Sequence, residues 1–96
     1  MTTIKLLPLV GGFAENKDIA KELRLTTIVP ALEKNEKVVL DFDGIEGATQ
    51  SFIHALISDV VRKFGSDVLD RLYFKGCSKT VQKMINIVTD YIQEAE

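Results

Sequence analysis

The chain has 96 residues, of which 46% are hydrophobic and 27% charged, and its formal net charge is -2. This length suits one domain over residues 1–96, and the balanced charge gives no reason to expect a nucleic-acid partner. The longest apolar run is too short to span a bilayer, no basic and apolar leader begins the chain, and its single cysteine suits a reducing compartment. We therefore expect a cytoplasmic protein without a membrane segment.

The first half of the chain predicts two strands on either side of a helix. Residues 4–10 predict an edge strand, because Pro8 cannot donate a hydrogen bond to a neighbouring strand. Asn16 is a candidate N-cap of the helix, which Pro30 either kinks or restarts with a fresh first turn. Residues 38–42 are a nearly continuous run of β-prone residues, typical of a central strand covered on both faces.

The second half predicts two long helices around a third strand. Residues 50–64 have the period of an amphipathic helix that Gly65 ends, and residues 66–70 predict one further helical turn. A strand over residues 71–75 follows, and Ser78 is a candidate cap of the last helix. The order β-α-β-α-β-α with short links favours an α/β fold with a mainly parallel sheet covered by helices.

Acidic side chains gather where the strand over residues 38–42 ends. Asp41 and Asp43 either bind Mg²⁺ or act as an acid–base pair, or they end the strand and accept hydrogen bonds from loop amides. Cys77 precedes a helix, a position that lowers the pKa of a thiol in some proteins, but Lys83 replaces the arginine of the Cys-x5-Arg phosphatase pattern. A small nucleotide- or Mg²⁺-binding enzyme that uses these residues is one hypothesis.

Hydroxyl groups mark the start of the helix over residues 50–64. Thr49 or Ser51 is suited to cap this helix. The alternative is phosphorylation at Ser51 or Thr49, because a helix N-terminus favours anions, and a phosphate would add a charge of about -2 near Glu46. Polar residues continue along the helix at intervals of three or four, which indicates a solvated face rather than a Ser–His catalytic pair. This polar stripe comprises Ser51, His54, Ser58 and Arg62.

The segments 30–34 and 38–44, followed by Ser51-Phe52 at a helix start, resemble the STAS-like domain family of unknown function. The resemblance covers roughly residues 19–95. That family is more distantly similar to the STAS domains of bacterial anti-sigma factor antagonists. Those domains are small α/β modules that bind a kinase-type anti-sigma factor and are switched by phosphorylation at a helix start.

The resemblance assigns positions of this chain to the antagonist pattern. Asp41 and Gly44 match its strand-end aspartate and glycine, and its Asp-Ser-Ser/Thr-Gly motif falls on residues 49–52. Gln50 takes the position of the usual phosphoacceptor, so Ser51 alone retains a hydroxyl in the core of the motif. The resemblance therefore implies the fold and a partner-docking role more directly than it implies a phosphorylation switch.

We expect a non-enzymatic regulatory or adaptor module that binds a partner protein through the loop after the central strand and the helix that follows. The resemblance implies a histidine-kinase-type ATPase as the partner. The alternative function is that of a phosphorylation-switched antagonist of a kinase-type anti-sigma factor. Neither function requires a cofactor, a metal ion, nucleic acid or a membrane. The expected partner-binding residues are Asp43, Glu46, Thr49, Gln50, Ser51, His54, Ser58 and Arg62.

Overall fold

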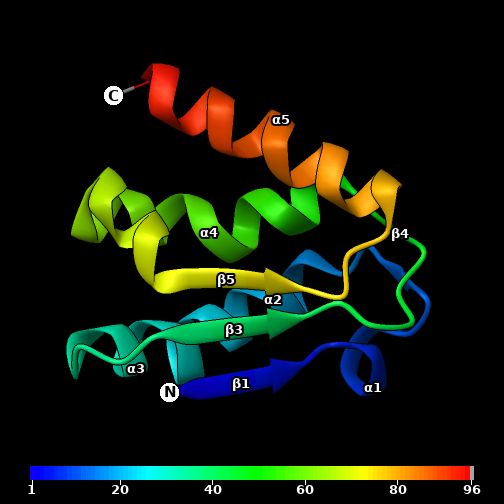
Figure 1. The fold of residues 1–96 in the computed structure, drawn as a ribbon, viewed down its shortest axis with the longest axis horizontal. Coiled ribbons are helices and arrows are strands. Elements are labelled where there is room, and N and C mark those ends of the chain that lie inside the picture. The colour runs from blue at the N-terminus through cyan, green and yellow to red at the C-terminus, as the bar shows by residue number, and fades with distance from the viewer. Residues whose placement is uncertain (96) are drawn as a thin grey trace.

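The computed structural model describes residues 1–95 and has the α/β fold that the sequence predicts (Figure 1). The strands are β1 (Thr2–Lys5), β2 (Phe13–Ala14), β3 (Val38–Asp41), β4 (Gly47–Ala48) and β5 (Leu72–Lys75). The helices are α1 (Leu7–Val10), α2 (Lys17–Leu23), the π-helical turn η1 (Arg24–Ile28), α3 (Val29–Glu33), α4 (Gln50–Phe64), the 3-10 segment η2 (Ser66–Arg71) and α5 (Lys79–Ala95). Among the described residues, no helix is both long and apolar enough to cross a membrane.

The main sheet has three parallel strands in the order β1-β3-β5. The predicted central strand is therefore central, and the first strand lies at an edge, as the proline indicated. The first strand is nevertheless shorter than predicted, because it ends at Lys5 and residues 7–10 form α1. Pro8 lies in the first turn of α1, where its missing N–H group costs no helical hydrogen bond.

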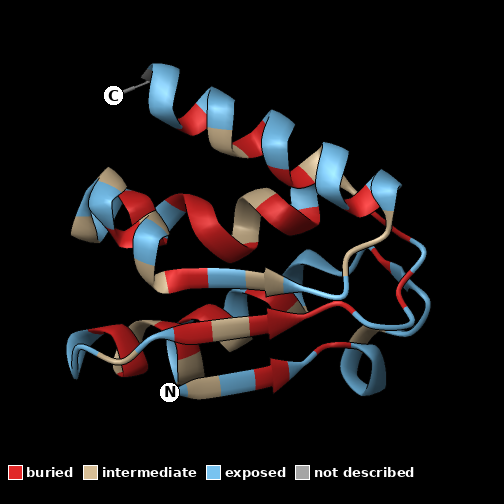
Figure 2. Cartoon of the chain, in the orientation of Figure 1, coloured by how far each residue is buried: buried red, intermediate tan, exposed pale blue. Residues whose placement is uncertain are grey.

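One face of the sheet carries the hydrophobic core. Val38, Leu40 and Leu72 are buried on this face, and they belong to one cluster with the apolar residues of the helices. On the opposite face Val39 is half-buried, and its neighbours across the strands, Thr3 and Tyr73, are exposed. The expectation that β3 is covered on both faces is thus wrong: in Figures 1 and 2 helix α2 lies behind the strands and α4 and α5 lie above β5, while no helix lies in front of the described strands.

The helical stretch after Asn16 is interrupted before Pro30. The side chain of Asn16 caps α2 by accepting hydrogen bonds from the amides of Asp18 and Ile19, at 3.0 and 3.2 Å. The π-helical turn η1 follows, and α3 then begins with Pro30 in its first turn. Of the two predicted effects of Pro30, a kink or a new first turn, the structure shows the new first turn. Proline fits this position without strain.

The second half of the chain follows the predicted pattern closely. Helix α4 has the expected bounds and ends at Gly65, whose φ of 86° suits glycine. The Oγ atom of Ser78 accepts a hydrogen bond of 3.1 Å from the amide of Val81, which confirms the predicted cap of α5. Strand β5 begins at Leu72, one residue later than expected, because η2 extends through Arg71.

Candidate functional site

The turn after β3 is built around Asp41. Its side chain is largely buried, and its Oδ1 atom accepts a hydrogen bond of 2.9 Å from the amide of Asp43. Gly44 continues the turn with a φ of 85°, and a Cβ atom there would lie 2.6 Å from Cδ2 of Leu7. Asp41 therefore ends the strand and accepts a hydrogen bond from a loop amide, which is the second of the two roles predicted from the sequence. The Asp43 side chain is exposed to solvent.

The two carboxylates lie in different environments, and this bears on the magnesium hypothesis. Within residues 1–95, no group of three or more histidine, cysteine, aspartate or glutamate side chains is placed to hold a metal ion. Asp41 already accepts a hydrogen bond from the backbone, and Asp43 faces water. The arrangement offers a structured turn with one exposed acid rather than a convergent acid–base pair.

Contacts from distant segments fix the loop between Asp43 and the start of α4. The amide of Glu46 donates a hydrogen bond of 2.8 Å to the carbonyl of Gly12, and the Oγ atom of Ser78 donates one of 2.9 Å to the carbonyl of Glu46. Strand β4 then pairs in parallel with β2. The loop is thus held at the carboxyl ends of the strands by contacts within the chain.

The two-residue strands β2 and β4 were not predicted. They are too short for an alternation of apolar and polar residues to be recognised. Gly47 shows why the pairing is close, since a Cβ atom at this position would lie 2.9 Å from Cε1 of Phe13. Phe13 is itself 53% exposed, so its ring covers the loop and also forms part of the surface.

Thr49 caps helix α4, which confirms one of the two predicted cap residues. Its Oγ1 atom accepts a hydrogen bond of 3.0 Å from the amide of Phe52. Gln50 and Ser51 follow in the first turn, and both are exposed. Among the described residues, the Ser51 side chain makes no hydrogen bond, so its hydroxyl is accessible whereas that of Thr49 is engaged.

A hollow of about 340 Å³ lies beside the start of α4. Gln50, Ser51, His54 and Ala55 line one side of it, and Lys17 from the start of α2 lines the other. Lys17 was missed by the sequence analysis because it lies more than 30 residues away and belongs to no motif. The structure therefore brings three predicted site residues together and adds one cation to them.

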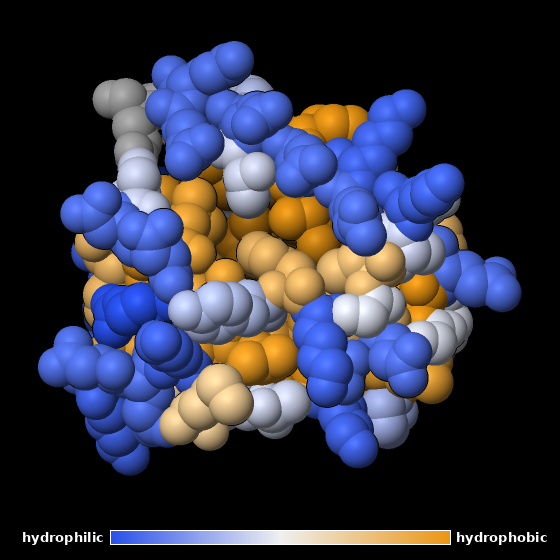
Figure 3. Space-filling model, in the orientation of Figure 1, coloured by the Kyte–Doolittle hydropathy of each residue, from blue (hydrophilic) through white to orange (hydrophobic). Residues whose placement is uncertain are grey.

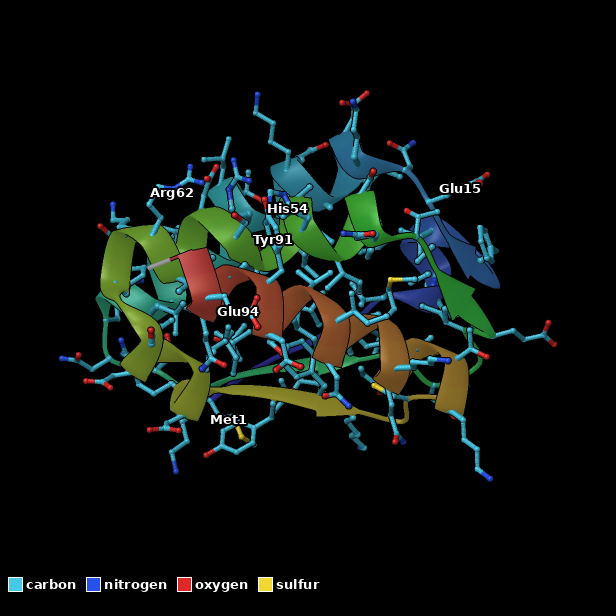
Figure 4. All side chains as sticks on the ribbon, turned by 90° about the horizontal axis from the view of Figure 1, so that it is seen from above. Met1, Glu15, His54, Arg62, Tyr91 and Glu94 are labelled. Carbon is cyan, nitrogen blue, oxygen red and sulfur yellow. The ribbon has the colours of Figure 1, made fainter. Side chains whose placement is uncertain are left out.

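The ring of His54 also meets helix α5. Its centroid lies 6.4 Å from that of Tyr91, and the two rings are tilted by 56°. Figure 4 shows the two side chains together, seen from above, at the seam between α4 and α5. Tyr91 is 59% exposed, so it extends the surface around His54 with a second ring that the sequence analysis did not include.

Further along α4, Arg62 belongs to a separate cluster of charges. Its Nη1 atom lies 2.8 Å from Oδ1 of Asp59, and Nη1 of Arg24 lies 3.2 Å from Oδ2 of the same carboxylate. Arg24 also donates a hydrogen bond of 2.7 Å to the carbonyl of Ala55, and its side chain is largely buried. Arg62 is about three helical turns from Ser51, so the predicted site residues form two groups.

Ser58 is a correction to the predicted polar stripe. It is buried, with 5% of its surface exposed, and is therefore not part of a partner-binding surface. Helix α4 contacts α2, η1, η2 and α5, so its buried face is wider than the spacing of its apolar residues indicated. A small hydroxyl residue fits within this packed face, which a sequence pattern does not distinguish from a solvated position.

Cys77 lies between β5 and α5 and is half-buried. Burial, and secondarily the negative charge of Asp41, raise the pKa of the Cys77 thiol above its ordinary value. A raised pKa leaves less thiolate at neutral pH, which disfavours a role of this cysteine as a nucleophile. The geometry thus agrees with a packing role at the turn.

Comparison with protein-family models matches residues 20–82 to the STAS-like domain of unknown function (DUF4325). The match covers more than half of the chain, and the protein belongs to this family. No curated protein and no solved structure gives a significant match. The family assignment agrees with the small α/β fold and its parallel strands.

Proposed function

We propose that this protein is a non-enzymatic regulatory or adaptor module of the cytoplasm that binds a partner protein. The docking surface comprises the loop from Asp43 to Thr49 and the first turns of α4. The observation that carries the proposal is the hollow in which Gln50, Ser51 and His54 face Lys17. A loop that is ordered in advance loses little conformational entropy on binding, which favours a specific partner.

The charges and the rings of this surface support the proposal that it recognises a partner. Asp43 and Glu46 lie exposed at the loop, and His54 adds a ring that contacts Tyr91. Polar groups on a rigid frame give an interface its specificity, and aromatic rings supply contact area. The resemblance to anti-sigma factor antagonists suggests a histidine-kinase-type ATPase as the partner.

The test is a binding titration with purified proteins encoded beside this gene, beginning with any histidine-kinase-type ATPase. The test variant combines Gln50→Ala, Ser51→Ala and His54→Ala, and the control is Gln93→Ala, at an exposed position of α5. We expect the triple variant to weaken binding about tenfold or more and the control to leave the affinity unchanged. Equal affinity of the triple variant and the wild type would show that the surface is elsewhere.

The second candidate function adds a phosphorylation switch at Ser51. The specific observation in its favour is the exposed Ser51 hydroxyl in the first turn of α4, beside Lys17. The helix N-terminus and a nearby ammonium group both stabilise a phosphate. Thr49 is the weaker candidate, because its hydroxyl caps the helix.

Intact-mass analysis after incubation with the partner ATPase and ATP tests this switch. We expect one added phosphate on the wild type and on Thr49→Ser, which keeps the capping hydroxyl, but none on Ser51→Ala. An unmodified wild-type mass, under conditions in which the ATPase phosphorylates a control substrate, would contradict the switch while leaving the binding proposal intact.

A further inference from the structure

The strand β5 leaves one edge of the main sheet open. Among the described strands it pairs with β3 alone, and the carbonyl of Lys75 accepts a hydrogen bond of 2.7 Å from the amide of Phe42. Backbone groups alternate in direction along a strand, so the N–H and C=O of Phe74 point away from β3. Among the described residues neither group has a hydrogen-bond partner, and such an edge is a template for another strand.

A second hollow lies beside this open edge. It has a volume of about 360 Å³, and its lining is uncharged. Figure 3 shows hydrophobic surface between the polar outer side of α5 and the strand region below it. The hollow has room for one side chain projecting from an added strand, for which Phe74 and Ile85 are the apolar contacts and polar groups form much of the remaining lining. Its lining residues are Phe74, Gly76, Cys77, Gln82, Ile85 and Asn86.

The face of the sheet opposite the hollow carries two lysines close to β5. Lys75 is exposed at the end of the strand, and the ammonium group of Lys37 lies 5.8 Å from the centroid of the Tyr73 ring. Successive side chains of an added strand point alternately to the two faces of the sheet. A strand whose apolar residue enters the hollow would therefore place its flanking residues on the face that carries Lys37 and Lys75.

We propose that the open edge of β5 binds an extended peptide segment of a partner protein by strand addition, centred on Phe74. The segment has an apolar residue for the hollow, flanked by acidic residues that meet Lys37 and Lys75. A second copy of this chain fits less well, because two-fold pairing of β5 would bring Arg71 and Lys75 of each copy towards cations of the other. This site adjoins the loop of the first docking surface, since a Cβ atom at Gly76 would lie 2.9 Å from the amide nitrogen of Asp43, but it shares no residue with the start of α4.

The test uses the full chain labelled with ¹⁵N and a synthetic peptide with alternating glutamate and valine and one central leucine. We expect millimolar or tighter binding that slows hydrogen exchange at the amide of Phe74. The same peptide, N-methylated on the backbone groups that would pair with Phe74, should bind about tenfold more weakly. A peptide of equal composition without the alternation is the control for charge alone.

Two variants of α5 locate the site. Asn86→Trp fills the rim of the hollow and should weaken binding of the peptide about tenfold, whereas Ile87→Trp, on the adjacent exposed position, should change it less than about twofold. Gln82→Trp replaces Asn86→Trp if that variant fails to fold. Neither rim variant should alter binding at the start of α4.

Three results would overturn the proposal. They are the absence of binding at millimolar peptide, equal binding of the N-methylated peptide, and exchange protection that maps away from Phe74. Sedimentation provides the remaining test. If the wild-type chain associates with itself and Asn86→Trp abolishes this association, the open edge of β5 binds a second copy of the chain and the peptide proposal is wrong.

Discussion

The Oγ1 atom of Thr49 accepts a hydrogen bond of 3.0 Å from the amide of Phe52, and this bond sets the first turn of α4. Because the Thr49 hydroxyl is engaged, Ser51 presents the accessible hydroxyl of this turn. The two adjacent candidates for modification thus have different physical roles. One stabilises the helix, and the other faces the hollow that Lys17 borders.

Thr49→Ala should lower the free energy of unfolding by about 1 kcal/mol, because it removes the helix cap. Ser51→Ala should change it by less than about 0.5 kcal/mol, since Ser51 is exposed and its side chain makes no hydrogen bond with the described residues. Urea denaturation of the two variants measures the difference. Equal losses would mean that the two hydroxyls do not have these separate roles.

Arg24→Ala should cost about 2 kcal/mol of unfolding free energy. It removes a largely buried guanidinium that binds the Ala55 carbonyl and the Asp59 carboxylate. Arg62→Ala is the matched control, because it also contacts Asp59 but is exposed, and it should cost less than about 0.5 kcal/mol. If thermal or urea unfolding gave Arg62→Ala the larger effect, the assignment of Arg24 as the residue that holds η1 against α4 would be wrong.

Gly44→Ala should lower the free energy of unfolding by about 1 kcal/mol or more. The φ of Gly44 is 85°, a backbone conformation that strains a residue with a Cβ atom. The added methyl group would also lie 2.6 Å from Cδ2 of Leu7, so the Leu7 side chain would have to move. The shift of the urea midpoint, with unchanged slope, measures the loss; a change of less than about 0.5 kcal/mol would contradict the strained conformation of this turn.

The Cys77 thiol should react slowly with iodoacetamide at neutral pH in the folded protein. Burial and Asp41 raise its pKa, so the thiolate fraction is smaller than in the unfolded chain, and the rate should rise when urea unfolds the protein. The folded state also holds this proton more tightly. The contribution of the protonated Cys77 thiol to the free energy of unfolding is therefore complete below the pKa that the thiol has in the unfolded chain. This contribution is lost as the pH rises through the pKa of the thiol in the folded protein.

Cys77→Ser should reduce this alkaline loss of stability, and urea titrations on both sides of the thiol pKa measure it. Faster alkylation of the folded protein than of the unfolded chain would instead identify an activated cysteine.

The sequence predicted those features that depend on regular periods or on strong local signals. Helix α4, its stop at Gly65 and the central place of β3 follow from apolar spacing and glycine. The sequence did not predict the short strands β2 and β4 or the helical turn α1, because a segment of two to four residues is too short to show a period of apolar residues.

The candidate site was predictable only in part. Gln50, Ser51 and His54 lie within one turn of sequence, so their proximity followed from the helix. Lys17 and Tyr91 reach the same surface through tertiary packing that no local pattern encodes. The burial of Ser58 was missed for the same reason, since neighbours on several sides cover this helix.

The most direct test of the docking surface is the affinity of the triple variant for the partner protein. Isothermal titration of the wild type, of Gln50→Ala combined with Ser51→Ala and His54→Ala, and of Gln93→Ala gives the three dissociation constants. We predict that only the triple variant loses about tenfold or more in affinity, with its fold intact by circular dichroism. Equal dissociation constants for all three proteins would contradict the proposal that the start of α4 binds the partner.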